Sequence, residues 1–119
     1  MEKDADTCEL LRALLGRERY EITCVGTVAE ALFFARSGLF DLYLLEQKFC
    51  DGTGVELCER IRLNDPETPV VFFTSAAFER DRRRALEAGA QAYLVKPNHL
   101  DILTDTVRRL LQREAAAYA

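Results

Sequence analysis

The stretch Leu42-Tyr43-Leu44-Leu45 is an unbroken apolar run that ends at a charged residue, Glu46. A run of this kind is typical of a parallel β-strand that is covered on both faces. The turn sequence Asp51-Gly52-Thr53-Gly54 follows, and apolar residues then recur at helical spacing from Val55 until the chain reaches Pro66. This succession of a buried strand, a turn and an amphipathic helix predicts an α/β protein.

The same pattern recurs on both sides of this stretch. Towards the C-terminus, two apolar runs predict strands and two periodic patterns predict helices: strands at Val70–Phe73 and Ala92–Val95, helices at Arg80–Ala88 and Leu100–Leu111. Towards the N-terminus, Tyr20–Val25 alternates as a strand does, between helices that begin with capping-box sequences at Asp6 and Thr27. We therefore expect parallel strands, joined by right-handed crossovers, in a three-layer sandwich.

Length and charge limit the class of protein. The 119 residues predict a single domain over residues 1–119. Sixteen basic and 20 acidic side chains give a net charge of −4, which argues against direct nucleic-acid binding. The longest apolar runs fall far short of the roughly 20 residues that cross a bilayer, and Met1-Glu2-Lys3-Asp4 does not resemble a signal peptide. We expect a cytoplasmic protein without a membrane segment.

Cysteine and histidine usage offers little chemistry. Cys8, Cys24, Cys50 and Cys58 do not follow zinc-site spacings, so we expect buried thiols. His99 is the only histidine, which excludes a histidine-based metal cluster and most hydrolytic enzymes.

A polar side chain directly follows each of three predicted strands. Glu46 follows Leu45, Lys96 follows Val95, and a hydroxyl, that of Thr74, follows Phe73. Open α/β sheets bind ligands outside the carboxyl ends of their strands. We therefore expect a carboxylate, a hydroxyl and an ammonium group to converge at one edge of the sheet.

These residues stand in a set of motifs that resembles the receiver domain of two-component response regulators, from Glu2 to about Arg113. The motifs are Asp41-Leu42-Tyr43-Leu44-Leu45, Asp51-Gly52-Thr53-Gly54, Phe73-Thr74-Ser75-Ala76, Ala88-Gly89-Ala90 and Tyr93-Leu94-Val95-Lys96-Pro97. The resemblance implies a flavodoxin-like, doubly wound parallel sheet in the order 2-1-3-4-5, sandwiched by helices.

The resemblance also implies roles for particular residues. In this family a sensor histidine kinase supplies a phosphoryl group to an aspartate after the third strand, aided by Mg²⁺ that acidic residues hold. Glu46 stands at the phosphoacceptor position, while Thr74 and Lys96 match the hydroxyl and the ammonium of the phosphoryl pocket. Tyr93 matches the switch aromatic. The acidic metal pocket aligns with Glu2 and Lys3.

Two of these positions depart from the family pattern. The extra methylene of Glu46 displaces its carboxylate, and Lys3 places a cation where a ligand of Mg²⁺ is expected. We therefore expect a pseudo-receiver that is not an enzyme, needs no metal or cofactor, and acts by protein–protein interaction independent of phosphorylation. The alternative is a receiver that a sensor histidine kinase still phosphorylates, with Mg²⁺, at Glu46 or Asp51. We also predict that Glu46 pairs with Lys96, with Lys3 as a second candidate partner, in a pocket without a metal; the alternative is that Glu46 is only solvated by water.

The resemblance further implies an interaction surface and reveals a missing element. Protein partners are expected on the surface formed by the fourth helix, fifth strand and fifth helix. A homodimer is left open as an alternative. On the fourth helix, we expect two surface ion pairs, Glu79–Arg83 and Arg83–Glu87. Only Met1 precedes Glu2, so we expect the family's central first strand to be absent from these 119 residues. Direct pairing of its neighbours, a strand from a second chain, or a truncated chain would each account for this.

Overall fold

The computed structural model describes residues 5–17, 20–96 and 99–117. The helices are α1 (Ala5–Gly16), α2 (Val28–Ala35), α3 (Gly54–Asn64), α4 (Glu79–Glu87) and α5 (Leu100–Ala117). The strands are β1 (Tyr43–Leu45), β2 (Lys48–Phe49), β3 (Gly52–Thr53), β4 (Val70–Thr74) and β5 (Ala92–Val95).

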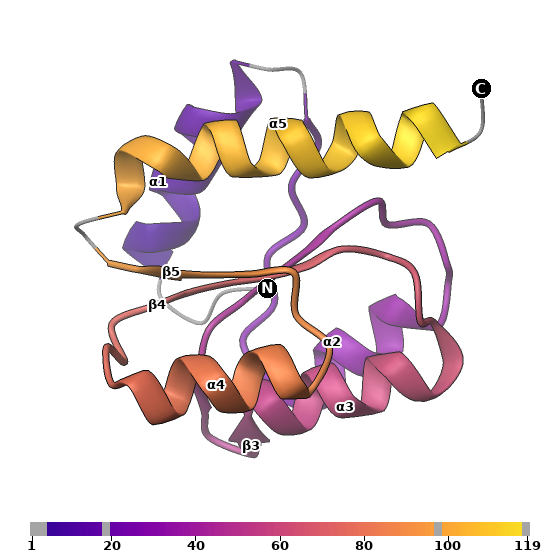
Figure 1. Cartoon of the computed structure of the whole chain (residues 1–119), viewed down its shortest axis with the longest axis vertical. Helices are drawn as coiled ribbons and strands as arrows, with labels where there is room; N and C mark the ends of the chain where they lie inside the picture. The colour runs from indigo at the N-terminus through magenta and orange to yellow at the C-terminus, as the bar shows by residue number, and fades with distance from the viewer. Residues whose placement is uncertain (1–4, 18–19, 97–98, 118–119) are drawn as a thin grey trace.

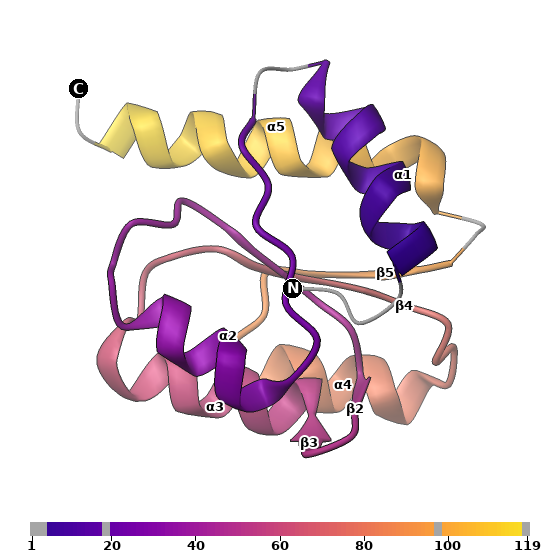
Figure 2. The same ribbon diagram turned by 180° about the vertical axis from the view of Figure 1, so that it is seen from behind.

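The main sheet is parallel and has the order β1-β4-β5. In its register, Leu45 lies opposite Phe72, which in turn lies opposite Tyr93. Helices α1 and α5 cover one face, and α2, α3 and α4 cover the other (Figures 1 and 2). The predicted α/β class and doubly wound, flavodoxin-like sandwich are confirmed.

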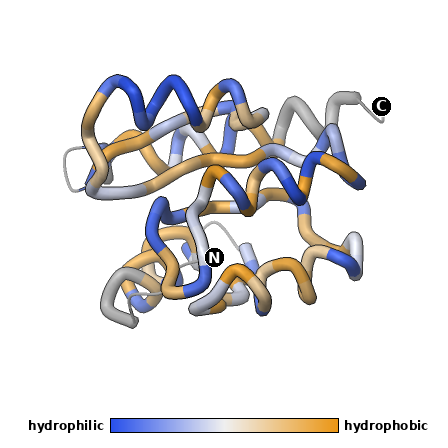
Figure 3. Tube along the Cα trace, turned by 90° about the horizontal axis from the view of Figure 1, so that it is seen from below, coloured by the Kyte–Doolittle hydropathy of each residue, from blue (hydrophilic) through white to orange (hydrophobic). Residues whose placement is uncertain are grey.

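Each face of the sheet has its own hydrophobic core. On the side of α2, α3 and α4, β4 contributes Val70 and Phe72; on the side of α1 and α5, it contributes Val71 and Phe73. All four side chains are buried, as the unbroken apolar run predicts. Hydrophobic residues run along the interior strands, whereas the helices alternate between hydrophobic and hydrophilic residues around their turns (Figure 3).

A short hairpin follows β1 and was not predicted. Strands β2 and β3 pair antiparallel, with Lys48 opposite Thr53. The predicted turn lies here, and the Thr53 side chain accepts a hydrogen bond from the Glu56 amide, which caps α3. The hairpin brings the start of α3 against the end of β1, where the Gly54 amide donates to the Gln47 carbonyl at 2.9 Å.

Of the two predicted helix N-caps, one is confirmed and the other is wrong. Thr27 caps α2 as expected, since its hydroxyl accepts a hydrogen bond from the Glu30 amide at 3.0 Å. The predicted N-cap at Asp6 is wrong, because α1 already begins at Ala5 and therefore includes Asp6 in its first turn.

Asp51 also caps α2, from a distant part of the chain. Its two carboxylate oxygens accept hydrogen bonds from the amides of Val28 at 2.8 Å and Ala29 at 3.0 Å. These two backbone hydrogen bonds lower the pKa of Asp51 below its ordinary value of 3.8. Asp51, the alternative phosphoacceptor, is thus engaged at the start of a helix.

This cap predicts a specific acid sensitivity. A lowered carboxyl pKa contributes stability above the unfolded-state pKa, and this contribution disappears as pH falls through the folded-state pKa. We expect Asp51→Asn to lower the urea midpoint at neutral pH, and the difference from wild type to shrink between about pH 5 and about pH 2. Glu87→Gln, an exposed change on α4, is the control. A difference that stays constant with pH would contradict this role.

The predicted strand Tyr20–Val25 is wrong as a strand. The segment is extended and its exposure alternates, but it pairs with no strand within the described residues. Within the described residues, β1 pairs with β4 and does not pair with residues 20–25. Of the three ways to account for the first strand, direct pairing of its two neighbours is therefore excluded.

The expectation of four buried thiols is also wrong. Cys8 and Cys24 form a disulfide that ties α1 to the extended segment. Cys50 is exposed, and Cys58 is the buried free thiol. Sequence spacing did not indicate this pairing, because it depends on α1 packing beside a segment 16 residues further along.

Candidate functional site

Glu46 and Lys96 meet at the carboxyl edge of the sheet. Glu46 directly follows β1 and Lys96 directly follows β5, and the Lys96 Nζ donates to the Glu46 Oε2 at 2.9 Å. The side chains are only 10% exposed for Glu46 and 19% for Lys96. The structure thus joins the predicted carboxylate and ammonium in a largely desolvated ion pair, and Glu46 is not a solvated side chain.

The backbone around Glu46 fixes the orientation of its carboxylate. Its second oxygen, Oε1, accepts a hydrogen bond from the Gln47 amide at 2.6 Å. Behind it, Gly54 packs directly against the Glu46 carbonyl. Both carboxylate oxygens therefore have donors, and the residue lies between the end of β1 and the start of α3.

Lys96 is held by the neighbouring strand. Its backbone amide donates to the Thr74 carbonyl at 2.8 Å, and its Nζ lies 5.5 Å from the centroid of the Phe73 ring. A cation over an aromatic face is attracted electrostatically. Thr74 and Phe73, the last residues of β4, therefore position the ammonium that pairs with Glu46.

Thr74 and Tyr93 act on the loop after β4. The Thr74 hydroxyl accepts a hydrogen bond from the Ala76 amide at 3.2 Å, while the Tyr93 hydroxyl donates to the Ala76 carbonyl at 2.7 Å. The Tyr93 ring is buried and stacks on Phe72. Burial raises the pKa of Tyr93, so its hydroxyl remains a donor at neutral pH.

A cleft of about 660 Å³ opens at this edge. It is lined by Glu46, Thr74 and the residues that lead into α4, with Lys48 and Arg80 also contributing. The structure therefore brings Glu46, Thr74 and Lys96 to one place, and connects Tyr93 to it through Ala76. Glu2 and Lys3 lie outside the described residues.

The described part of this edge does not fit a divalent cation. Magnesium prefers several oxygen ligands, but Glu46 is already paired with an ammonium. Within residues 5–17, 20–96 and 99–117, no three His, Cys, Asp or Glu side chains are grouped so that they could hold a metal ion.

Helix α4 presents a basic surface beside the cleft. Arg80, Arg82, Arg83 and Arg84 are exposed, and the Arg80 guanidinium lies over the exposed ring of Phe78. The expected Glu79–Arg83 and Arg83–Glu87 ion pairs are not found among the described residues. Glu79 pairs with Arg82 at 3.2 Å, because the i,i+3 neighbour reaches its carboxylate.

Comparison with known proteins decides the family. The model of the response regulator receiver domain matches residues 1–108. The chain belongs to this family. The resemblance drawn from the motifs is confirmed, and the chain is a receiver domain of two-component signalling.

Solved receiver structures share its fold. A two-component response regulator from Clostridium difficile is 32% identical, with a TM-score of 0.88, over 95% of this chain and 93% of that one. The HemR receiver domain from Leptospira biflexa is 31% identical, with a TM-score of 0.84, over 92% of this chain and 89% of that one.

Curated relatives are longer proteins. The transcriptional regulatory protein PmrA of Pectobacterium parmentieri is 34% identical over 95% of this chain and 51% of its own length. The response regulator protein PilR of Pseudomonas aeruginosa is 32% identical over 94% of this chain and 25% of its own length. This chain therefore spans about a quarter to a half of the length of these relatives.

No helix in the described part of the chain is long and apolar enough to cross a bilayer.

Three contributors to the receiver site were not predicted. Gln47 is buried beside the pair and donates its backbone amide to the Glu46 carboxylate. Ala76 contributes backbone groups, and Gly54 contributes the space for the Glu46 carbonyl. Nothing in the residue types signalled the first two. The glycine at the start of α3 was visible as a turn residue, but its contact depends on the hairpin.

Proposed function

We propose that this receiver domain is a pseudo-receiver, whose output is protein binding without phosphorylation. The observation that carries the proposal is the ion pair between Glu46 and Lys96. In a phosphorylated receiver, the ammonium offsets the negative charge of the phosphoryl group. Here the carboxylate of Glu46 already takes the place of the phosphoryl group as the anion that pairs with the ammonium of Lys96.

The ion pair opposes phosphoryl transfer for a physical reason. A phosphoryl group on Glu46 would require the carboxylate to leave Lys96 and turn towards the donor. Separating a desolvated ion pair leaves two poorly solvated charges, which is strongly unfavourable. The longer side chain also misplaces the attacking oxygen for in-line transfer.

The switch residues support a fixed output state. Tyr93 is buried, and both it and Thr74 are hydrogen-bonded to Ala76. These contacts hold the loop between β4 and α4 without a phosphoryl group to draw the hydroxyl inward. The proposal is that α4, β5 and α5 present one surface permanently.

The proposal includes a partner and excludes a metal. Exposed arginines on α4 favour a protein partner that is acidic at this contact. The domain would need neither Mg²⁺ nor another cofactor and would catalyse no reaction. It would act in the cytoplasm, without direct contact to nucleic acid. A sensor histidine kinase would meet it as a binding partner, and a homodimer through the same surface is compatible with this role.

Intact mass spectrometry with a small phosphodonor tests the proposal. The purified chain is incubated with Mg²⁺ and acetyl phosphate, and we expect no added phosphoryl group. The variant Lys3→Asp/Glu46→Asp reverses both departures, because it puts the family's aspartate at each position. It should gain one phosphoryl group that hydroxylamine removes. One hydroxylamine-sensitive phosphoryl group on the unchanged chain would contradict the proposal and favour the magnesium-dependent phosphoacceptor.

A further inference from the structure

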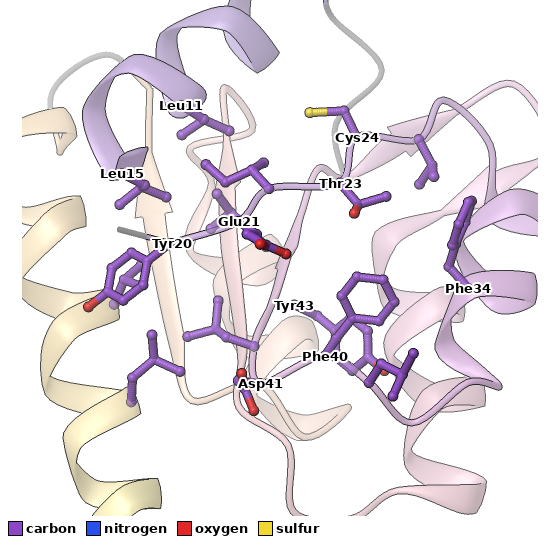
Figure 4. A pocket seen from close by; sticks show the side chains of 17 residues that line it. Leu11, Leu15, Tyr20, Glu21, Thr23, Cys24, Phe34, Phe40, Asp41 and Tyr43 are labelled. Atoms are coloured by element: carbon purple, nitrogen blue, oxygen red, sulfur yellow. The ribbon is translucent and has the colours of Figure 1, made fainter. Parts of the chain in front are cut away.

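The disulfide between Cys8 and Cys24 links two segments that lie outside the candidate functional site. It joins α1 to the extended residues 20–25, across a sequence separation of 16 residues. Figure 4 shows the Cys24 side chain on this segment, together with Leu11 and Leu15 of α1. Neither cysteine lines the cleft at Glu46.

Apart from the chain itself, this disulfide is the only bonded link between the two segments. Within residues 5–17 and 20–25, no hydrogen bond or ion pair connects one segment to the other. Helix α1 is otherwise held by apolar packing, since Leu11 and Leu15 belong to the same core as Val107 of α5. Cleavage of the disulfide would therefore leave α1 held by apolar contacts.

The two ends of the disulfide differ in exposure. Cys8 is 7% exposed and stands at helical spacing from Leu11 and Leu15, on the buried face of α1. Cys24 is partly exposed. A reductant from solvent can therefore approach the bond at Cys24, and a reduced Cys8 can remain in the core, because a buried thiol behaves as a small apolar group.

We propose that the Cys8–Cys24 disulfide is a reversible redox site, at which reduction by a dithiol loosens α1 from the core that it shares with α5. A thiolate of the dithiol attacks the Cys24 Sγ, the S–S bond breaks, and Cys8 leaves as a thiolate that takes up a proton. The second thiol of the donor then attacks the mixed disulfide and releases Cys24. In total, two electrons and two protons pass from the donor to the chain, and the donor becomes a disulfide.

The location of the chain favours a reversible disulfide over a permanent one. Disulfides in cytoplasmic proteins are usually transient, because thiol reductants keep most thiols reduced there. This step rests on the cytoplasmic location in the proposed function, but not on whether Glu46 is phosphorylated. Helix α5 belongs to the proposed partner surface, so the redox state would act on that surface through the core that α1 and α5 share.

Thiol labelling tests whether the bond opens in the folded chain. The oxidised chain is equilibrated in a mostly reduced glutathione buffer with a small dithiol, then unfolded and labelled with N-ethylmaleimide. We expect the number of labels to rise from two to four, because two of the four cysteines form the disulfide. Cys50→Ser, which removes the exposed free thiol, should show the same gain of two. Two labels after equilibration, or four before it, would overturn the proposal.

Amide hydrogen exchange tests the consequence for α1. We expect reduction to speed exchange in α1 by about tenfold or more, because the cross-link restricts the opened states of the loop that it closes. Exchange in β4 should stay slow. Cys24→Ser, a change at the partly exposed end, should show the fast exchange of α1 with and without reductant.

Two outcomes of the exchange measurement would overturn the proposal. Unchanged exchange in α1 on reduction would make the disulfide a site without a structural effect. Faster exchange throughout β4 would mean that reduction unfolds the whole domain rather than loosening α1. Neither measurement involves a phosphoryl group, so a failure here is distinguishable from a failure of the proposed function.

Discussion

Replacing Gly54 by Ala should lower the free energy of unfolding by about 3 kcal/mol, at the upper end of the usual range for overpacking. An added Cβ would collide with the Glu46 carbonyl and lie 2.7 Å from Cε2 of the buried Phe72 ring. Neither obstacle is the flexible end of a side chain. The start of α3 must therefore move away from the end of β1 and displace the segment that orients Glu46.

Thermal and urea unfolding measure this effect, and Gly16→Ala is the matched control. Gly16 ends α1, and an added Cβ there meets nothing within 4 Å. Alanine should be neutral or stabilise by up to about 1 kcal/mol, because glycine is the poorer helix former. A Gly54→Ala variant as stable as wild type would show that Glu46 is not held against α3.

Replacing Lys96 by Met should be the second large effect, with a loss of about 3 kcal/mol. The change leaves the Glu46 carboxylate, only 10% exposed, without its cation. The double variant Glu46→Leu/Lys96→Met removes both charges and should lie within about 1 kcal/mol of wild type. Urea unfolding of wild type, the two single variants Glu46→Leu and Lys96→Met, and the double variant near neutral pH gives the coupling between the two residues.

An exposed ion pair provides the comparison. The Arg82 Nη1 and the Glu79 Oε1 lie 3.2 Å apart, but the two side chains are 53% and 67% exposed. Arg82→Ala should therefore lower the free energy of unfolding by less than about 1 kcal/mol. If Lys96→Met were as mild as Arg82→Ala, the Glu46–Lys96 pair would be solvated in solution. The ion pair could then not block the phosphoryl pocket.

The sequence predicted most of the fold, because its signals are local. The apolar runs at β1, β4 and β5 and the turn before α3 all lie where the pattern indicated. Tyr20–Val25 failed because a strand also needs a neighbour, and alternation cannot report whether one is present. The hairpin of β2 and β3 and the Cys8–Cys24 disulfide were missed for a related reason, since both depend on segments that meet only in the folded chain.

The candidate site was predictable in its residues but not in its contacts. Parallel strands bring Glu46, Thr74 and Lys96 to one edge, so their convergence follows from topology. The hydrogen bonds at Ala76 and the close approach of Gly54 depend on loop geometry. The expectation that Lys3 approaches Glu46 falls outside the described residues.

The account depends on one claim, that Glu46 already neutralises Lys96 and holds the switch in a single state. The most direct measurement is an amide NMR titration of the chain with Mg²⁺ and beryllofluoride, a phosphoryl mimic. We predict that the amide signals of Thr74, Ala76, Tyr93 and Lys96 stay unchanged, while those of Lys3→Asp/Glu46→Asp shift. Saturable shifts of these four signals in the unchanged chain would contradict the account.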